Sequence, residues 1–158
     1  MSETPLWSPS RQRIAQTAMA DFMTAASSLA GQSLGSYRDL HDWSINDREA
    51  FWSLIWEDCG VIGDKGQRIV TAGHQMPGAA FFPDARLNFA ENLLRKRGAS
   101  SALVFKGEEK VQRRWSWDDL HAQVSRLQQL FADLGIKTGD RIAAMMPNMP
   151  ETIACMLA

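Results

Sequence analysis

The chain has 158 residues, of which 45% are hydrophobic and 22% are charged, and its formal net charge is -1. At this length a folded domain buries about 70% of the surface that its unfolded chain exposes. The balanced charge gives no electrostatic reason to expect nucleic acid or membrane as a partner. Met1 to Ser10 lack the basic and apolar stretches of an export signal, and no window approaches 18 consecutive apolar residues. We therefore expect a cytoplasmic location.

The first expected helix runs from Arg11 to Ala30, and Gly31 is placed to end it. Apolar residues recur along it at three- and four-residue steps, as expected for one buried helix face: Ile14, Ala18, Phe22, Ala25 and Leu29. The run GQSLGS that follows predicts a short linker, which we expect to separate this peripheral helix from the rest of the chain.

A second helix is predicted to open at Ser44, because Asp47 three residues later completes a capping-box pattern. Its buried stripe is unusually aromatic and comprises Phe51, Trp52, Ile55, Trp56 and Cys59. We interpret this stripe as core packing rather than as a stacking platform for bases or sugars. The spacing of Cys59 and Cys155 fits neither a redox pair nor a zinc site, so both are expected to be small buried hydrophobic residues.

The middle of the chain predicts a short strand at Arg68 to Thr71 and then a long surface loop from Gly73 to Asp84. A third helix is expected to begin at the Asn88 cap, with Glu91 at the third position. Its last turn is predicted to hold three cations before the stop at Gly98, namely Arg95, Lys96 and Arg97. Such a triplet suits the negative end of the helix dipole, with an anion-binding patch as the alternative.

From Ala99 onward, strand and helix patterns alternate. Ala102 to Phe105 and Val111 to Trp117 flank the turn KGEEK, which predicts an antiparallel hairpin. Ser116 and Asp119 form another capping box. The helix that follows is expected to bury one long apolar face: Trp117, Leu120, Val124, Leu127, Leu130, Phe131 and Leu134.

The carboxy-terminal residues predict half of a βαβ unit. Gly135 is expected to stop the preceding helix, and a turn at Gly139 and Asp140 leads into Arg141 to Met146, a nearly continuous apolar strand of the kind buried on both faces of a parallel sheet.

A last helix is then capped by Asn148 and Glu151, with Pro150 in its first turn. Because a crossover helix needs a following strand, we expect an incomplete α/β domain that is interrupted after Ala158. An unpaired strand of this kind also predicts self-association of the isolated chain.

No constellation in the sequence carries recognisable chemistry. His41, His74 and His121 are not spaced as metal ligands, and no serine elbow or cysteine nucleophile pattern accompanies the neighbours His41 and Asp42. Phosphate-binding glycine loops are absent from the sequence. The acidic pairs Glu108-Glu109 and Asp118-Asp119 are explained by a hairpin tip and a helix start.

The segment WSWDDLHAQVSRLQQLFADLGIKTGDRIAAMMPNMPETIACMLA, from Trp115 to Ala158, resembles the opening of the AMP-binding domain in the adenylate-forming superfamily of acyl-CoA synthetases. Upstream, Tyr37 to Val61 and Pro77 to Leu94 resemble the amino-terminal extension of its short-chain acid:CoA ligases, which share FW and FFP elements. The ending AENLL favours the branch that activates acetoacetate over the branch that activates acetate or propionate.

This resemblance implies an α/β fold, with a helical amino-terminal extension over residues 1–98 and the start of an AMP-binding domain over residues 99–158. It implies a ligase that uses ATP, magnesium and CoA to join acetoacetate to CoA through an acyl-adenylate. The family's motifs for catalysis, nucleotide binding and CoA binding all lie beyond Ala158. The resemblance therefore assigns no catalytic, cofactor-binding or metal-binding residue here, and it predicts an inactive chain without cofactors, or else a non-catalytic interaction module.

Overall fold

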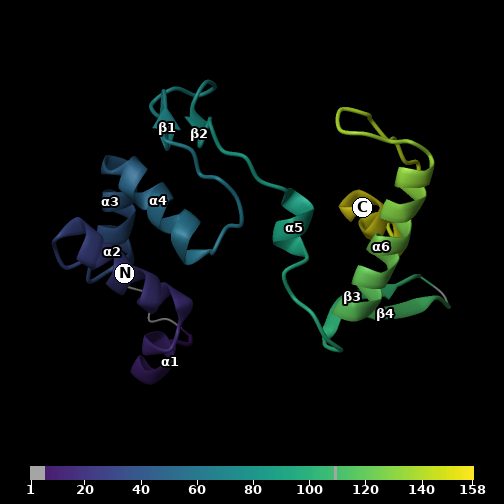
Figure 1. Cartoon of the computed structure of the whole chain (residues 1–158). Helices are drawn as coiled ribbons and strands as arrows, with labels where there is room; N and C mark the ends of the chain where they lie inside the picture. Colours follow the sequence, from purple (N-terminus) through teal and green to yellow (C-terminus); the bar gives the residue numbers. More distant parts are fainter. Residues whose placement is uncertain (1–5, 109) are drawn as a thin grey trace. The chain divides into compact units, whose positions relative to one another are not determined.

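The structure is a computed structural model, and it describes residues 6–108 and 110–158 (Figure 1). The chain divides into two compact units, one ending at Arg86 and the other spanning Leu87–Ala158. The sequence-based boundary at residue 98 concerns the family's domain organisation and stays a prediction.

The described residues of the amino-terminal unit form the helices α1 (Arg11–Ala15), α2 (Ala18–Ala30), α3 (Tyr37–Asn46) and α4 (Arg48–Asp58). The prediction of a single helix from Arg11 to Ala30 is wrong, because the helix is interrupted between Ala15 and Ala18. There Thr17 caps α2: its hydroxyl accepts a hydrogen bond from the Ala20 amide at 3.3 Å and donates one to the Ile14 carbonyl at 2.8 Å. Gly31 ends α2 in the left-handed conformation, at φ 65°, as predicted.

The capping box expected at Ser44 is also wrong. Ser44 lies within α3, where its hydroxyl donates to the His41 carbonyl at 2.7 Å. The box that starts α3 pairs Ser36 with Asp39, and Asp47 instead caps α4. The pattern Ser-x-x-Asp occurs at both places, so local sequence alone did not distinguish the helix start from a site inside the helix.

The core of this unit lies among α2, α3 and α4. Its buried residues are Phe22, Ala26, Leu34, Leu40 and Trp43. Leu34 belongs to the GQSLGS run, so this run contributes to the core and does not separate α2 from it. The ring of Phe51 meets those of Phe22 and Trp43 edge-on, each at 6.0 Å.

The aromatic stripe of α4 packs as predicted, except at its carboxyl end. Trp56 is buried and its ring lies 5.0 Å from that of Phe82, while Phe51, Trp52 and Ile55 are partly buried. Cys59 follows α4 as its carboxy-terminal cap and is exposed, so the expectation of a buried thiol is wrong there. Cys155 is only half-buried.

Residues 60–86 form a loop that contains two short strands. β1 (Val70–Thr71) pairs antiparallel with β2 (Ala80–Phe81), so the strand predicted at Arg68 to Thr71 is present in shortened form. The irregular loop predicted from Gly73 to Asp84 is wrong in part, because it contains β2. The pairing of β1 with β2 joins residues about ten positions apart, and local hydrophobic periodicity does not predict such pairing.

Polar contacts hold this loop in place. The Arg48 guanidinium donates to the Gly73 carbonyl at 2.6 Å, and the Lys65 ammonium lies 2.8 Å from the Glu57 carboxylate. Arg68 donates two hydrogen bonds to the two carboxylate oxygens of Asp84. Gly66 has φ 72°, and a Cβ there would lie 2.6 Å from that of Asp84. Only glycine therefore fits this turn without displacing the ion pair.

Acid is expected to weaken this loop through Asp84. The hydrogen bonds from Arg68 hold the pKa of Asp84 below its ordinary value. Because the folded-state pKa is the lower one, the pair stabilises the fold above the unfolded pKa, about pH 4, and this contribution is lost as the pH falls through the folded pKa. Asp84→Asn should remove that part of the acid dependence, measured as hydrogen exchange of residues 60–86 against pH. Arg68→Gln should reduce the acid dependence in the same way. If both variants keep the pH profile of the unsubstituted chain, the Arg68–Asp84 pair does not stabilise the loop.

The carboxy-terminal unit comprises α5 (Phe89–Leu93), β3 (Ser101–Lys106), β4 (Gln112–Ser116), α6 (Trp117–Asp133) and α7 (Pro150–Leu157). β3 and β4 form the antiparallel hairpin that was predicted. Glu109, at the hairpin tip, lies outside the described residues, whereas Asp118 lies in the first turn of α6 as expected. The capping box of α6 is confirmed, with the Ser116 hydroxyl 3.1 Å from the Asp119 amide and the Asp119 carboxylate 2.9 Å from the Ser116 amide.

The core of the carboxy-terminal unit lies between α6 and α7, against the hairpin. Leu120, Val124, Ala154 and Leu157 are buried. The apolar face predicted for α6 is correct in its first half, whereas Leu130 and Leu134 are 49% and 68% exposed. Gly135 follows α6 with φ 75°, as expected for a stop.

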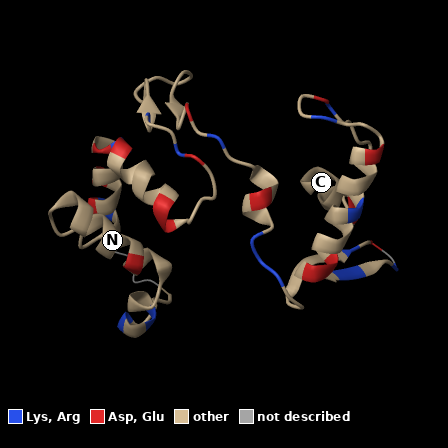
Figure 2. Ribbon diagram, viewed as in Figure 1, with Lys and Arg blue, Asp and Glu red and all other residues tan. Residues whose placement is uncertain are grey.

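The cation triplet does not close a helix. α5 begins at the Asn88 cap as predicted but ends at Leu93, and its last turn carries no basic residue. The exposed residues Arg95, Lys96 and Arg97 therefore lie in the connection from α5 to β3, which is the blue stretch there in Figure 2. One contact with the helix end remains as predicted: the Nε atom of Arg95 donates to the carbonyl of Asn92, in the last turn of α5, at 3.0 Å.

The strand predicted at Arg141 to Met146 does not form. These residues have no regular structure and are exposed, with Met145 entirely accessible. A strand requires hydrogen-bonded neighbours, and none is present within the described residues. Asn148 is not a cap either: Met149 takes that position without a side-chain bond, and Pro150 occupies the first turn of α7 as predicted.

Candidate functional site

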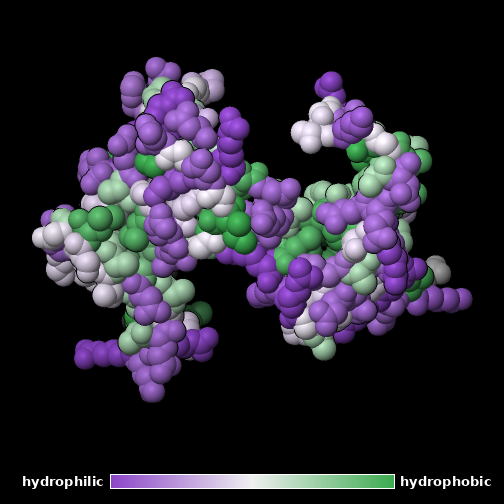
Figure 3. All heavy atoms as spheres, viewed as in Figure 1, coloured by the Kyte–Doolittle hydropathy of each residue, from purple (hydrophilic) through white to green (hydrophobic). Residues whose placement is uncertain are grey.

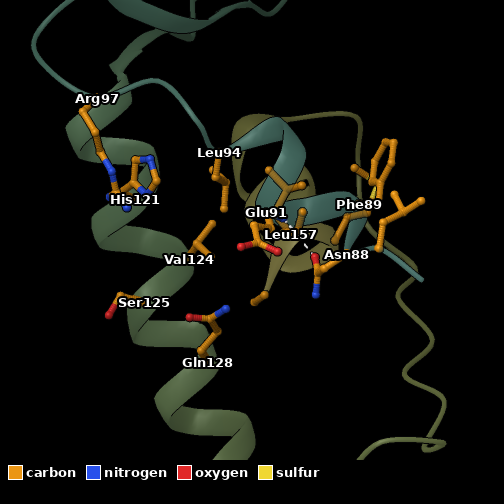
Figure 4. A pocket seen from close by; sticks show the side chains of 14 residues that line it. Asn88, Phe89, Glu91, Leu94, Arg97, His121, Val124, Ser125, Gln128 and Leu157 are labelled. Atoms are coloured by element: carbon orange, nitrogen blue, oxygen red, sulfur yellow. Dashed lines mark hydrogen bonds between the residues drawn. The ribbon is translucent and has the colours of Figure 1, made fainter. Parts of the chain in front are cut away.

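A hollow of the carboxy-terminal unit lies among α5, α6 and α7, and we call it the α5–α6–α7 hollow (Figure 4). Its volume is about 840 Å³. Buried Val124 and Leu157 contribute its apolar floor. Further apolar residues and six polar ones complete the lining, and the polar ones are Asn88, Glu91, Arg97, His121, Ser125 and Gln128. The hollow thus combines an apolar floor with groups that can donate or accept hydrogen bonds.

Helix geometry brings these groups together. His121, Ser125 and Gln128 are four and three residues apart on α6, so they share one face. Asn88 is fixed as the cap of α5, because its side-chain oxygen accepts a hydrogen bond from the Glu91 amide at 2.9 Å. The sequence analysis did not identify this polar face of α6. The three- and four-residue spacing of its side chains is the signal that could have revealed it.

Two polar groups in the hollow, His121 and Ser125, form hydrogen bonds within the unit. The Nε2 atom of His121 lies 2.9 Å from the Lys96 carbonyl, so this nitrogen carries the proton and donates. The Ser125 hydroxyl accepts a hydrogen bond from the Gln129 amide at 3.2 Å. No hydrogen bond joins Ser125 to His121 within the described part of the chain, so the pair does not form an activated nucleophile.

The three histidines are not brought together. His41 lies on α3 and is exposed, with its Nδ1 atom 3.6 Å from the Asp42 carboxylate, and His74 lies in the loop between β1 and β2. Only His121 reaches the α5–α6–α7 hollow. Within residues 6–108 and 110–158, no group of three or more His, Cys, Asp and Glu side chains could hold a metal ion. That the chain carries no catalytic, cofactor-binding or metal-binding residue stays a prediction.

One ion pair ties the hairpin to α7. Arg113 on β4 contacts the Oε1 atom of Glu151 in the first turn of α7. The Oε2 atom of Glu151 is buried and has no hydrogen-bond partner among the described residues. The pair therefore holds α7 against the hairpin.

Two family models match the chain. The model described as "Acetyl-coenzyme A synthetase N-terminus" matches residues 37–93, and the model described as "AMP-binding enzyme" matches residues 89–158. Together they cover the segments on which the resemblance was based. None of the described helices has the length and apolar character required to cross a bilayer.

Individual relatives match almost the whole chain. Acetoacetyl-coenzyme A synthetase of Rhizobium meliloti is 54% identical over 99% of this chain, and malonamoyl-CoA synthetase of Penicillium aethiopicum is 34% identical over 99%. The solved structure of acetoacetyl-CoA synthetase from Streptomyces lividans superposes with a TM-score of 0.82 at 34% identity and covers 98% of this chain.

The match is restricted to one region of these relatives. The chain covers 24% of the Rhizobium meliloti protein, 22% of the Penicillium aethiopicum protein and 25% of the solved chain, and thus spans about a quarter of their length. The predicted mixed α/β fold is confirmed by the structural match. The chain is thus similar to the amino-terminal quarter of acetoacetyl-CoA synthetases, and its residues 89–158 match the AMP-binding enzyme model.

Proposed function

We propose that this chain is the amino-terminal region of an AMP-forming ligase that joins acetoacetate to CoA. The identity of 54% to an acetoacetyl-coenzyme A synthetase along nearly the whole chain carries this proposal. The complete ligase would use ATP, magnesium and CoA and would act in the cytoplasm. Residues 1–98 would form its extension and residues 99–158 the start of its AMP-binding domain.

We propose no residue of this chain as a ligand of these cofactors. No group of three or more His, Cys, Asp and Glu side chains among the described residues could hold a metal ion, and His121 and Ser125 of the α5–α6–α7 hollow hydrogen-bond within the unit. We therefore derive no catalytic step from this chain. Its role in the proposed ligase is structural: it supplies the hairpin, α6 and α7 on which further parts of the AMP-binding domain would pack.

The proposal is tested with the complete reading frame that contains these 158 codons. Its product should form acetoacetyl-CoA from acetoacetate, ATP, magnesium and CoA, measured by chromatography of the thioester. The 158-residue chain should give no turnover above a blank without protein. Turnover by the 158-residue chain alone would contradict the structural role.

A different acid is the second candidate for the proposed ligase. The malonamoyl-CoA synthetase is 34% identical to this chain, whereas the acetoacetyl-CoA synthetase of Danio rerio is 28% identical. Sequence identity in this region therefore does not by itself indicate which acid a relative activates. A competition assay should rank acetoacetate above malonamate, acetate and propionate, and a strong preference for one of those three would overturn the substrate while leaving the ligase class intact.

A non-catalytic interaction module on the same scaffold is the alternative from another class. The reading frame after codon 158 distinguishes the two. Continuation into a Ser/Thr/Gly-rich, lysine-containing loop favours the ligase, whereas a stop codon at that point favours the module.

A further inference from the structure

An apolar groove lies among α2, α3 and α4 of the amino-terminal unit, and we call it the α2–α3–α4 groove. Its volume is about 410 Å³. Its lining includes Phe22 and Leu40, which are buried, and Met19, which is 49% exposed. In Figure 3, hydrophobic residues lie on the surface where Figure 1 places α2. Exposed apolar surface of this kind is typical of a place where another element packs.

One acidic side chain lines the groove. Asp58 is the last residue of α4, and the last turn of α4 holds no basic residue. The carboxyl end of a helix carries a partial negative charge, so a carboxylate there makes the local potential more negative. Among the described residues, Lys65 pairs with the neighbouring Glu57, whereas no ion pair includes Asp58. The groove therefore suits an occupant that carries a cation beside an apolar side chain.

Helix α1 carries this combination. Ile14 is 50% exposed, and Arg11, three residues before it, lies on the same face of the helix. Residues 6–16 contain two arginines and no acidic residue. No residue of α1 is buried, and none lines the groove. Within one copy of the chain, the groove and the apolar side chain of α1 therefore both stay uncovered.

We propose that the α2–α3–α4 groove binds α1 of a second copy of this chain. Ile14 of each copy lies in the groove of the other copy, and Arg11 pairs there with Asp58. The exchange is reciprocal, so a single two-fold axis covers both grooves and closes the assembly as a dimer. The contact uses only residues of the amino-terminal unit, and it does not depend on which acid the proposed ligase activates.

Sedimentation velocity of the 158-residue chain tests the dimer, which should replace the monomer as the protein concentration rises. Ile14→Gln should raise the dissociation constant about 100-fold, because each dimer loses two buried isoleucine side chains. Leu29→Gln is the matched control. Leu29 is 55% exposed on α2 of the same unit but does not line the groove, so its substitution should leave the dissociation constant unchanged. A monomer at every soluble concentration, or equal effects of the two substitutions, would overturn the inference.

Charge reversal distinguishes binding to a second copy from closure of α1 on its own groove. Arg11→Asp and Asp58→Arg should each weaken the dimer of the variant chain, because both contacts then bring like charges together. Mixing the two variants should restore the dimer, because one contact has both charges reversed and the other is unchanged. Circular dichroism should show equal helix content in both variants, since both positions are exposed.

Two results of the charge-reversal experiment would overturn the inference. The first is a mixture that stays as monomeric as the separate variants, because the Arg11–Asp58 contact between copies would then not exist. The second is association that none of these substitutions changes, because the contact would then lie in another part of the chain, such as the exposed residues Arg141 to Met146.

Discussion

Replacing Trp43 by alanine is expected to destabilise the amino-terminal unit strongly. Trp43 is 7% exposed and packs in the cluster of Phe22, Ala26, Leu34 and Leu40, with its ring edge-on to Phe51. Truncating a buried tryptophan removes apolar burial and leaves a cavity, at a cost of about 3–5 kcal/mol. This is a large part of the stability of a unit of this size, since small domains are stable by about 5–15 kcal/mol.

The measurement for Trp43→Ala is hydrogen exchange resolved by segment, because the two units need not unfold together. Amides of α2, α3 and α4 should lose protection, while amides of α6 should keep it. Trp7→Ala is the matched control, since Trp7 is 68% exposed and exposed substitutions usually change stability by less than about 0.5 kcal/mol. Comparable losses in the two variants would contradict the assignment of Trp43 to the core.

The second large effect is expected from Leu120→Ala in the carboxy-terminal unit. Leu120 is 3% exposed and lies on the face of α6 that packs with Val124, Ala154 and Leu157. Its truncation should destabilise this unit by about 2–5 kcal/mol, with the value depending on how far the cavity collapses. Chemical denaturation followed by exchange of α6 and α7 measures the change.

Leu130→Ala provides the control on the same helix. Leu130 is also a leucine of α6 but is 49% exposed, so its truncation should change the stability of the 158-residue chain much less. The sequence places both residues on one apolar face, and the structure distinguishes them. If Leu130→Ala costs as much stability as Leu120→Ala, Leu130 is buried as the periodicity predicts. The exposure of the carboxy-terminal half of α6 in the structure would then be wrong.

Elements with strong local determinants could be predicted from the sequence. The hairpin of β3 and β4 and the long helix α6 were correct, because an apolar alternation, a turn and a capping box all agree there. Gly31 and Gly135 were correct as stops for the same reason. In each case one short segment contains the local signals that predict the structure.

Elements that depend on distant partners could not be predicted in this way. β2 exists because β1 pairs with it, and Leu34 is buried because α2 and α3 enclose it. Arg141 to Met146 show the opposite case, in which strand composition is present but no strand among the described residues pairs with it. The α5–α6–α7 hollow was missed because it combines α6 with elements on both sides of it in sequence.

Each of the two units has its own buried cluster, and this affects the order in which they can fold during synthesis. All buried residues of the amino-terminal cluster lie between Phe22 and Trp43, and the aromatic residues that pack on them follow within α4. A chain emerging from the ribosome could therefore complete this cluster before α6 is synthesised, because amino-terminal domains generally fold first. The amino-terminal unit would then be a folded body while the sheet of the proposed ligase is still being translated.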